Sequence, residues 1–158
     1  MTVIEFSDWL SATPASQFIQ VTTWIIPAVQ TVHILALALL FASALMVDLR
    51  VLGTGLRSES LQSVADRFIP TIWPCLLVLL VTGSLLIVAE PGRTLGNPAF
   101  YLKMTCLAAA IIVTLWLRAF ARGSRPIGGL ASLLAVVSLL LWGTIIVAGR
   151  YIAYIESN

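Results

Sequence analysis

Long apolar stretches alternate with short polar ones along the chain. Each apolar stretch approaches or exceeds the ~20 helical residues that cross the hydrocarbon core of a bilayer. The four stretches cover approximately residues 24–47, 72–89, 100–117 and 130–149. The pattern therefore predicts an all-α integral membrane protein, with residues 1–158 forming one domain of four transmembrane helices.

The segments between the later spans have the composition of turns. AEPGRTLGNP holds two prolines and two glycines, and GSRPIGG holds three glycines and a proline. Because such short connections place each helix antiparallel beside its neighbour, we expect an up-down four-helix bundle. Membrane helices approach most closely at small residues, which predicts helix contacts at Ala38, Ala42, Ala108, Ala109 and Gly143.

Two flanking segments mix apolar and polar positions. VIEFSDWL near the N-terminus fits either a short amphipathic helix on the membrane surface or a plain polar lead-in. SESLQSVADRFIP, before the second span, suits a short interfacial helix, and Pro70 and Pro74 predict a bend where that span begins.

Composition strengthens the membrane assignment. The chain is 59% hydrophobic and only 10% charged, far outside the range of soluble domains, so the lipid bilayer is its expected surroundings. A net charge of +2 gives no basis for nucleic-acid binding.

The distribution of basic residues predicts the topology. Six arginines follow the first span or link the third and fourth: Arg50, Arg57, Arg67, Arg118, Arg122 and Arg125. The opposite side has Arg93, Lys103 and Arg150. By the positive-inside rule, both termini face outward, away from the cytoplasm.

One histidine interrupts the apolar pattern of the first span. His33 lies nine residues after Trp24, or about 14 Å at the rise of an α-helix, near the middle of the hydrocarbon core. Gln30 lies one turn earlier on the same face. Since polar groups that face lipid are costly, we expect His33 to face protein, a cofactor or water. Asp48 and Arg50, at the other end of the span, are expected to mark its inner boundary.

A second polar group is expected in a layer near the outer headgroups, made of Glu90, Arg93, Asn97, Lys103 and Arg150. His33 would lie about 9 Å deeper than Lys103. Lys103 and Arg150 are also typical of basic residues that anchor helix ends in the headgroups, and Glu90 could pair with either neighbouring arginine.

This arrangement offers what a heme b group needs: an imidazole for the iron, apolar walls for the ring and basic groups for the propionates. The candidate cofactor-binding residues are His33 as the iron ligand, with Gln30, Lys103, Arg150 and Arg93. A single histidine leaves three arrangements open: a five-coordinate iron, another sixth ligand, or His33 from two subunits. We therefore expect electron transfer, with a quinone or an outer redox partner, or a heme-dependent oxidation; whether the protein is an enzyme stays open.

Two other functions fit the same residues. In the first, a small transporter or channel subunit passes protons, metal ions or a small solute along Gln30 and His33. In the second, a structural or accessory subunit of a membrane complex uses His33 only for a hydrogen bond to a Ser, Thr or carbonyl of another helix. Homo-oligomerisation is plausible under all three functions.

The motifs VQTVHILALALLF, VDLRVLG, VTGSLLIVAEP, GNPAFYLKM and VAGRYIAY together resemble a family of uncharacterised bacterial four-span membrane proteins, from about Phe6 to Tyr154. This resemblance implies the bacterial inner membrane and supplies no chemistry.

The chain is also distantly similar to the heme-containing protoporphyrinogen oxidase of bacteria and to the copper-resistance D type membrane proteins. In that oxidase a first-span histidine precedes a Leu-Pro-Arg stretch, and the third span carries a functional lysine. His33 precedes Asp48-Leu49-Arg50 at similar spacing, and Lys103 opens the third span. The resemblance implies heme b on His33 with Lys103 nearby. Asp48 stands where the oxidase has proline, so oxidase activity is not carried over.

Overall fold

Four long helices form the body of the protein. The computed structural model describes residues 2–123 and 128–154. The long helices are α3 (Ile25–Val51), α4 (Leu61–Ala89), α6 (Pro98–Arg122) and α7 (Gly129–Tyr154). Each is long and apolar enough to cross a membrane. The predicted four-span membrane protein is confirmed, and no strand occurs in the described ranges.

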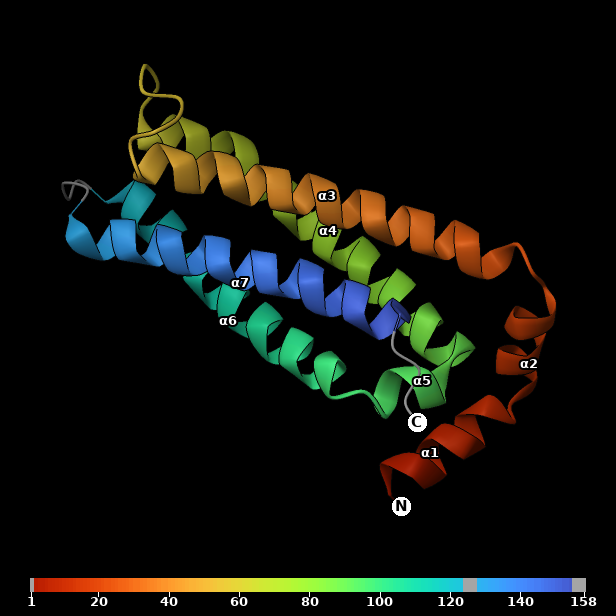
Figure 1. The fold of residues 1–158 in the computed structure, drawn as a ribbon. Helices are drawn as coiled ribbons and strands as arrows, with labels where there is room; N and C mark the ends of the chain where they lie inside the picture. The colour runs from red at the N-terminus through yellow and green to blue at the C-terminus, as the bar shows by residue number, and fades with distance from the viewer. Residues whose placement is uncertain (1, 124–127, 155–158) are drawn as a thin grey trace.

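The four helices run alternately up and down in one bundle (Figure 1). α3 packs mainly on α4, and α6 packs mainly on α7. The two pairs meet chiefly where α3 contacts α7, whereas α4 and α6 contact each other only slightly. The bundle is therefore two helix hairpins joined along one side.

Three short helices lie at one end of the bundle, which we call the α5 end (Figure 1). They are α1 (Val3–Ser11), α2 (Pro14–Val21) and α5 (Pro91–Leu95). α1 begins with a capping box between Thr2 and Glu5, and α2 begins at Thr13 with Pro14 in its first turn. The opposite end, where α3 connects to α4, is called the loop end.

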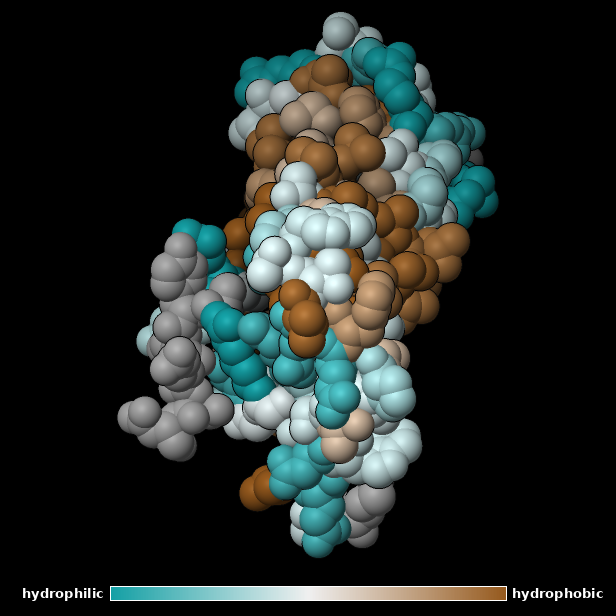
Figure 2. Space-filling model, turned by 90° about the vertical axis from the view of Figure 1, so that its right-hand side faces the viewer, coloured by the Kyte–Doolittle hydropathy of each residue, from teal (hydrophilic) through white to brown (hydrophobic). Residues whose placement is uncertain are grey.

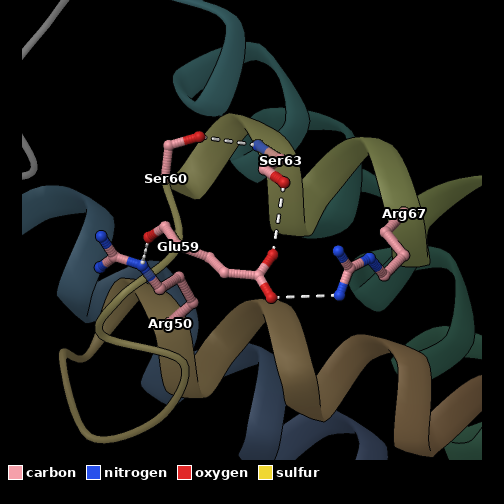
Figure 3. A network of polar contacts seen from close by, with 5 residues as sticks. All are labelled: Arg50, Glu59, Ser60, Ser63 and Arg67. Carbon is pink, nitrogen blue, oxygen red and sulfur yellow. Dashed lines mark hydrogen bonds and ion pairs between the residues drawn. The ribbon is translucent and has the colours of Figure 1, made fainter.

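A polar network joins α3 to α4 at the loop end (Figure 3). The Arg50 Nε donates a hydrogen bond to the Glu59 carbonyl (2.6 Å), and Arg67 pairs with the Glu59 carboxylate (3.1 Å). Ser60 caps α4 by accepting from the Ser63 backbone N–H. These contacts fix the turn that reverses the chain.

The helix boundaries differ from the predicted ones at several points. The segment expected as a separate interfacial helix is the first part of α4, which continues through Pro70 and Pro74. A helix is present where VIEFSDWL allowed one, and α2 is a further helix that was not predicted. Small residues were wrongly assigned to helix contacts at Ala38, Ala42 and Ala108, which are exposed. Arg125 lies outside the described residues.

The buried core is concentrated toward the loop end and the middle of the bundle. In α3 the buried side chains begin only at Leu40, and in α6 only at Ala110. Trp142 of α7 is fully buried and packs with Leu40, Ala44 and Ala110 in the central cluster. The first fifteen residues of α3 and the first twelve of α6 include no fully buried side chain, although Leu37, Cys106 and Leu107 are partly buried against the central cluster.

Apolar side chains cover much of the outside of the bundle. Figure 2 views the molecule from its α2 side: apolar residues gather on the upper half of this face, and the lower part is mostly hydrophilic. Exposed leucine, isoleucine and valine side chains occur on all four long helices. Such a surface is typical of helices that face lipid, in agreement with a multi-pass membrane protein.

Candidate functional site

His33 joins α3 to α4 through a hydrogen bond. Its Nδ1 lies 2.8 Å from the hydroxyl oxygen of Thr82, which is buried. The imidazole is half-buried, and its ring lies beside Gly83, where an added Cβ would be 3.6 Å from His33 Cε1. The structure therefore confirms that His33 faces protein, as its depth in the span suggested.

The surroundings of Thr82 determine which nitrogen of His33 carries the proton. The Thr82 hydroxyl lies 2.7 Å from the Val78 carbonyl, one turn earlier in α4, and donates its single proton there. Its oxygen can then only accept from His33, so Nδ1 is the protonated nitrogen and Nε2 carries the lone pair. Among the described residues, Thr82 is the one side chain found bonded to His33, and Nε2 is available to a ligand.

Lys103 lies on the other side of the same region. Its ammonium group lies against α7, where a Cβ added to Gly149 would be 3.7 Å from Lys103 Nζ. Lys103 is half-buried, which places a cation inside the α5-end half of the bundle rather than on its rim. His33 and Lys103 thus lie in the same half of the bundle, on α3 and α6, with His33 against α4 and Lys103 against α7.

The other predicted site residues lie at or near the surface. Arg93 forms an ion pair with Glu90 at 3.0 Å, which is one of the two pairings that the sequence allowed. Arg150 is exposed, one residue after Gly149. Gln30 is also exposed, so its amide does not line an internal path in the single chain. The structure does not gather these three residues around His33.

In the half of the bundle that contains His33 and Lys103, α3 and α6 are only partly covered by other helices. α3 and α6 have no fully buried side chain there and expose many apolar ones, although both are apolar in that stretch. Water is absent from the core of a bilayer, so these surfaces must contact lipid, a second protein or a bound apolar molecule. The loop-end half, by contrast, is closed by side chains of all four helices.

The described residues offer little for a metal held by protein ligands alone. No group of three or more His, Cys, Asp or Glu side chains comes together in the described ranges. A metal that brings its own equatorial ligands, such as heme iron, needs only an axial imidazole. In His33 the Nδ1 bonds to Thr82, and Nε2 has no hydrogen-bond partner in the part of the chain that the structure describes.

A separate groove of about 890 Å³ runs between α6 and α7 on the surface of the bundle. It is lined mainly by apolar side chains and includes neither His33 nor Lys103. The groove is therefore separate from the residues of the candidate site.

A functional candidate whose burial the sequence did not reveal lies nearer the loop end. Asp48 was expected at the inner boundary of the first span, but its carboxyl is 1% exposed within the bundle. α3 continues past it to Val51. Thr114 of α6 and Ser138 of α7 are small polar residues, and each lies at about the same distance from the loop end of its own helix. These two residues were the missed signal that Asp48 has polar neighbours inside the bundle.

The chain belongs to a family of unknown function (DUF6644), whose model matches residues 10–155. It matches no curated protein and no solved structure.

Proposed function

We propose that this protein binds heme b in the membrane, with His33 as the axial ligand of the iron, and that it transfers electrons. When bound, the heme would supply one-electron chemistry to a quinone or to a redox partner outside the membrane. The observation that carries the proposal is the arrangement of His33, whose Nδ1–H is held by Thr82 while Nε2 is left with a free lone pair.

The position of Lys103 supports an anionic ligand. A half-buried ammonium in a hydrocarbon environment favours a partner that brings negative charge, and the two heme propionates have that charge. Arg150 and Arg93 lie near the same end and could hold the outer propionate. Gln30 is not part of this arrangement, because it is exposed.

The uncovered surfaces of α3 and α6 support a flat apolar ligand. They lie at the level of His33 and Lys103, where a porphyrin ring would replace lipid. His33 is the only histidine of the chain. The iron would therefore be five-coordinate within one chain, take another sixth ligand, or receive the His33 of a second copy.

We place the α5 end outside and the loop end in the cytoplasm of a bacterial cell. The described basic residues near the loop end are Arg50, Arg57, Arg67, Arg118 and Arg122. This excess over the α5 end follows the positive-inside rule. Heme would then lie in the half of the membrane that faces outward.

A second function is favoured by the same uncovered surfaces. If another chain covers α3 and α6, the protein is a structural subunit of a complex or a homo-oligomer, and the bond from His33 to Thr82 serves helix packing alone. Transport along Gln30 and His33 has no comparable support, because Gln30 is exposed.

Heme content of purified variants distinguishes the two functions. The wild-type protein, His33→Ala and Thr31→Ala would be produced in heme-replete cells and their heme-to-protein ratios measured. Thr31 is a matched control because it is exposed on α3, two residues away, and its hydroxyl bonds only to the Pro27 carbonyl of its own helix. Heme in the wild type and Thr31→Ala, with loss in His33→Ala, is the expected result.

Two further variants test the supporting residues. Thr82→Val should weaken heme binding by about 10- to 100-fold, the usual effect of removing a partner that orients a ligand histidine. Lys103→Gln should weaken it while Lys103→Arg retains it. Heme retained at the wild-type ratio by His33→Ala would rule out the proposal, and a heme-free wild-type oligomer would favour the structural subunit.

A further inference from the structure

A polar cavity lies inside the bundle, near the loop end and separate from His33. Its volume is about 10 Å³, which is about the space needed by one water molecule. All four long helices contribute to its wall: Ala44, Val47, Asp48, Ile69, Ile72, Thr114, Leu117 and Ser138. Three of these side chains are polar, and each comes from a different helix.

The cavity lies inside the bundle toward the loop end, where Asp48 is three residues before the end of α3. Thr114 is eight residues before the end of α6, and Ser138 is nine residues after the start of α7. At the rise of an α-helix both are about 12–14 Å from the loop end. Asp48 is 1% exposed and Ser138 is 1% exposed, so bulk water does not reach them.

Two polar atoms of this cavity have no hydrogen-bond partner within the described residues. They are Asp48 Oδ2 and Ser138 Oγ. Ser138 is near enough to act on the Asp48 carboxyl, but the two do not meet in a well-formed hydrogen bond. An orphaned buried oxygen normally signals a bound water or ion, because leaving it unpaired is costly.

The third polar group can only accept a hydrogen bond from the cavity. The Thr114 hydroxyl donates to the Ala110 carbonyl at 2.8 Å, so its oxygen lone pairs face other donors. An ionised Asp48 would be a second acceptor-only group. The Ser138 hydroxyl is the one side-chain donor in the cavity wall, and no wall residue carries a positive charge, so a carboxylate there is left uncompensated and a proton neutralises it.

No basic side chain lies in the cavity wall to balance an Asp48 carboxylate. On α4 the wall residues are Ile69 and Ile72, on α6 Thr114 and Leu117, and on α7 Ser138. The titratable and charged groups nearest along these helices are Arg50 on α3, Arg67, Asp66 and the Cys75 thiol on α4, and Arg118 and Arg122 on α6.

Several of these groups have partners elsewhere. Arg50 and Arg67 bind Glu59, and Arg122 lies 4.0 Å from Asp66. Figure 3 shows Arg50 and Arg67 turned toward Glu59 in the network at the loop end.

We propose that Asp48 is a proton-binding site inside the bundle. The carboxylate takes up one proton from water and becomes a neutral carboxylic acid. The cavity holds one water molecule, which accepts from the acid and donates to Thr114 Oγ1, while Ser138 completes its hydrogen bonds. Uptake of the proton removes the uncompensated charge from the core of the bundle, and no redox change is involved.

Infrared spectroscopy of the reconstituted full-length protein tests this site. A protonated carboxylic acid has a C=O stretching band that is separate from the amide bands and shifts in D₂O. We expect this band in the wild type near neutral pH, its loss in Asp48→Asn, and its retention in Asp66→Asn. Asp66 is the matched control because it is a carboxylate of the loop end whose side chain is 53% exposed.

A further variant keeps the test decisive if Asp48→Asn does not fold. Ser138→Ala leaves the carboxyl in place and removes one hydroxyl of the cavity, so it should shift the frequency of the band. Absence of the band at neutral pH, its persistence in Asp48→Asn, or an unchanged frequency in Ser138→Ala would overturn the proposal. A carboxylate band that responds to Na⁺ at constant pH would also overturn it, in favour of a metal-ion site.

Discussion

The hydrogen bond between His33 and Thr82 makes a prediction that can be measured apart from any cofactor. Thr82→Val keeps the shape of the side chain and removes its hydroxyl, so the 2.8 Å bond to His33 is lost together with the 2.7 Å bond to the Val78 carbonyl. Hydrogen bonds between membrane helices average about 0.6 kcal/mol and reach about 1.7 kcal/mol. Thr82 is 7% exposed, so the unpaired imidazole N–H adds to the cost.

We therefore expect Thr82→Val to lower the free energy of unfolding by about 1–2 kcal/mol. Reversible unfolding in mixed micelles, followed by circular dichroism, provides the measurement. Thr82→Ser retains the hydroxyl, so it should lower the free energy of unfolding by less than Thr82→Val does.

A double-mutant cycle isolates the contact itself. Combining Thr82→Val with His33→Ala should give a coupling energy of about 0.6–1.7 kcal/mol. If the two effects add within about 0.3 kcal/mol, the imidazole is not bonded to Thr82, and the assignment of the proton to Nδ1 fails.

Three further substitutions test the packing of the bundle by the same unfolding measurement. Trp142→Ala should lower the free energy of unfolding by about 3 kcal/mol. This is the low end for truncation of a buried aromatic side chain, because the unfolded state in a membrane is also in apolar surroundings. A decrease below about 1 kcal/mol would contradict the full burial of Trp142. Ala135→Leu should cost about 1–3 kcal/mol by overpacking a fully buried site, whereas Ala108→Leu on the exposed face should be neutral. Glu59→Gln should cost less than about 1 kcal/mol and lose its effect in high salt, since its ion pair with Arg67 is partly exposed.

The span pattern and the turns were predictable because membrane helices are long and uniformly apolar. Their boundaries were less predictable. α4 begins at Leu61 because Ser60 caps it and because a helix of 29 residues can carry an amphipathic first part beyond the hydrocarbon core. Pro70 and Pro74 do not separate the two parts, since helix interiors in membranes tolerate proline.

Composition did not reveal which face of each helix is buried and which is exposed. α3 is apolar all round, so nothing in its sequence distinguishes exposed Ala38 and Ala42 from buried Ala44. Asp48 was misplaced for a related reason: a charged residue near the end of a span usually marks the membrane boundary. Its burial depends on Ser138 and Thr114 from other helices, and a single segment does not reveal that contact.

The sequence predicted the surroundings of His33 better than those of Asp48. A lone imidazole near the middle of a span had to face protein, a cofactor or water, and the structure supplies Thr82 as its partner. Lys103 was expected near the outer headgroups, and it is half-buried beside Gly149 of α7. The open surfaces of α3 and α6 were not predictable, because they depend on how the two hairpins meet.

The visible absorption spectrum of the purified wild-type protein, recorded before and after reduction with dithionite, tests the central claim most directly. Binding of heme b through His33 predicts a Soret band in the oxidised protein, with sharpened bands on reduction. A colourless protein from heme-replete cells, folded by circular dichroism and without iron, would contradict it.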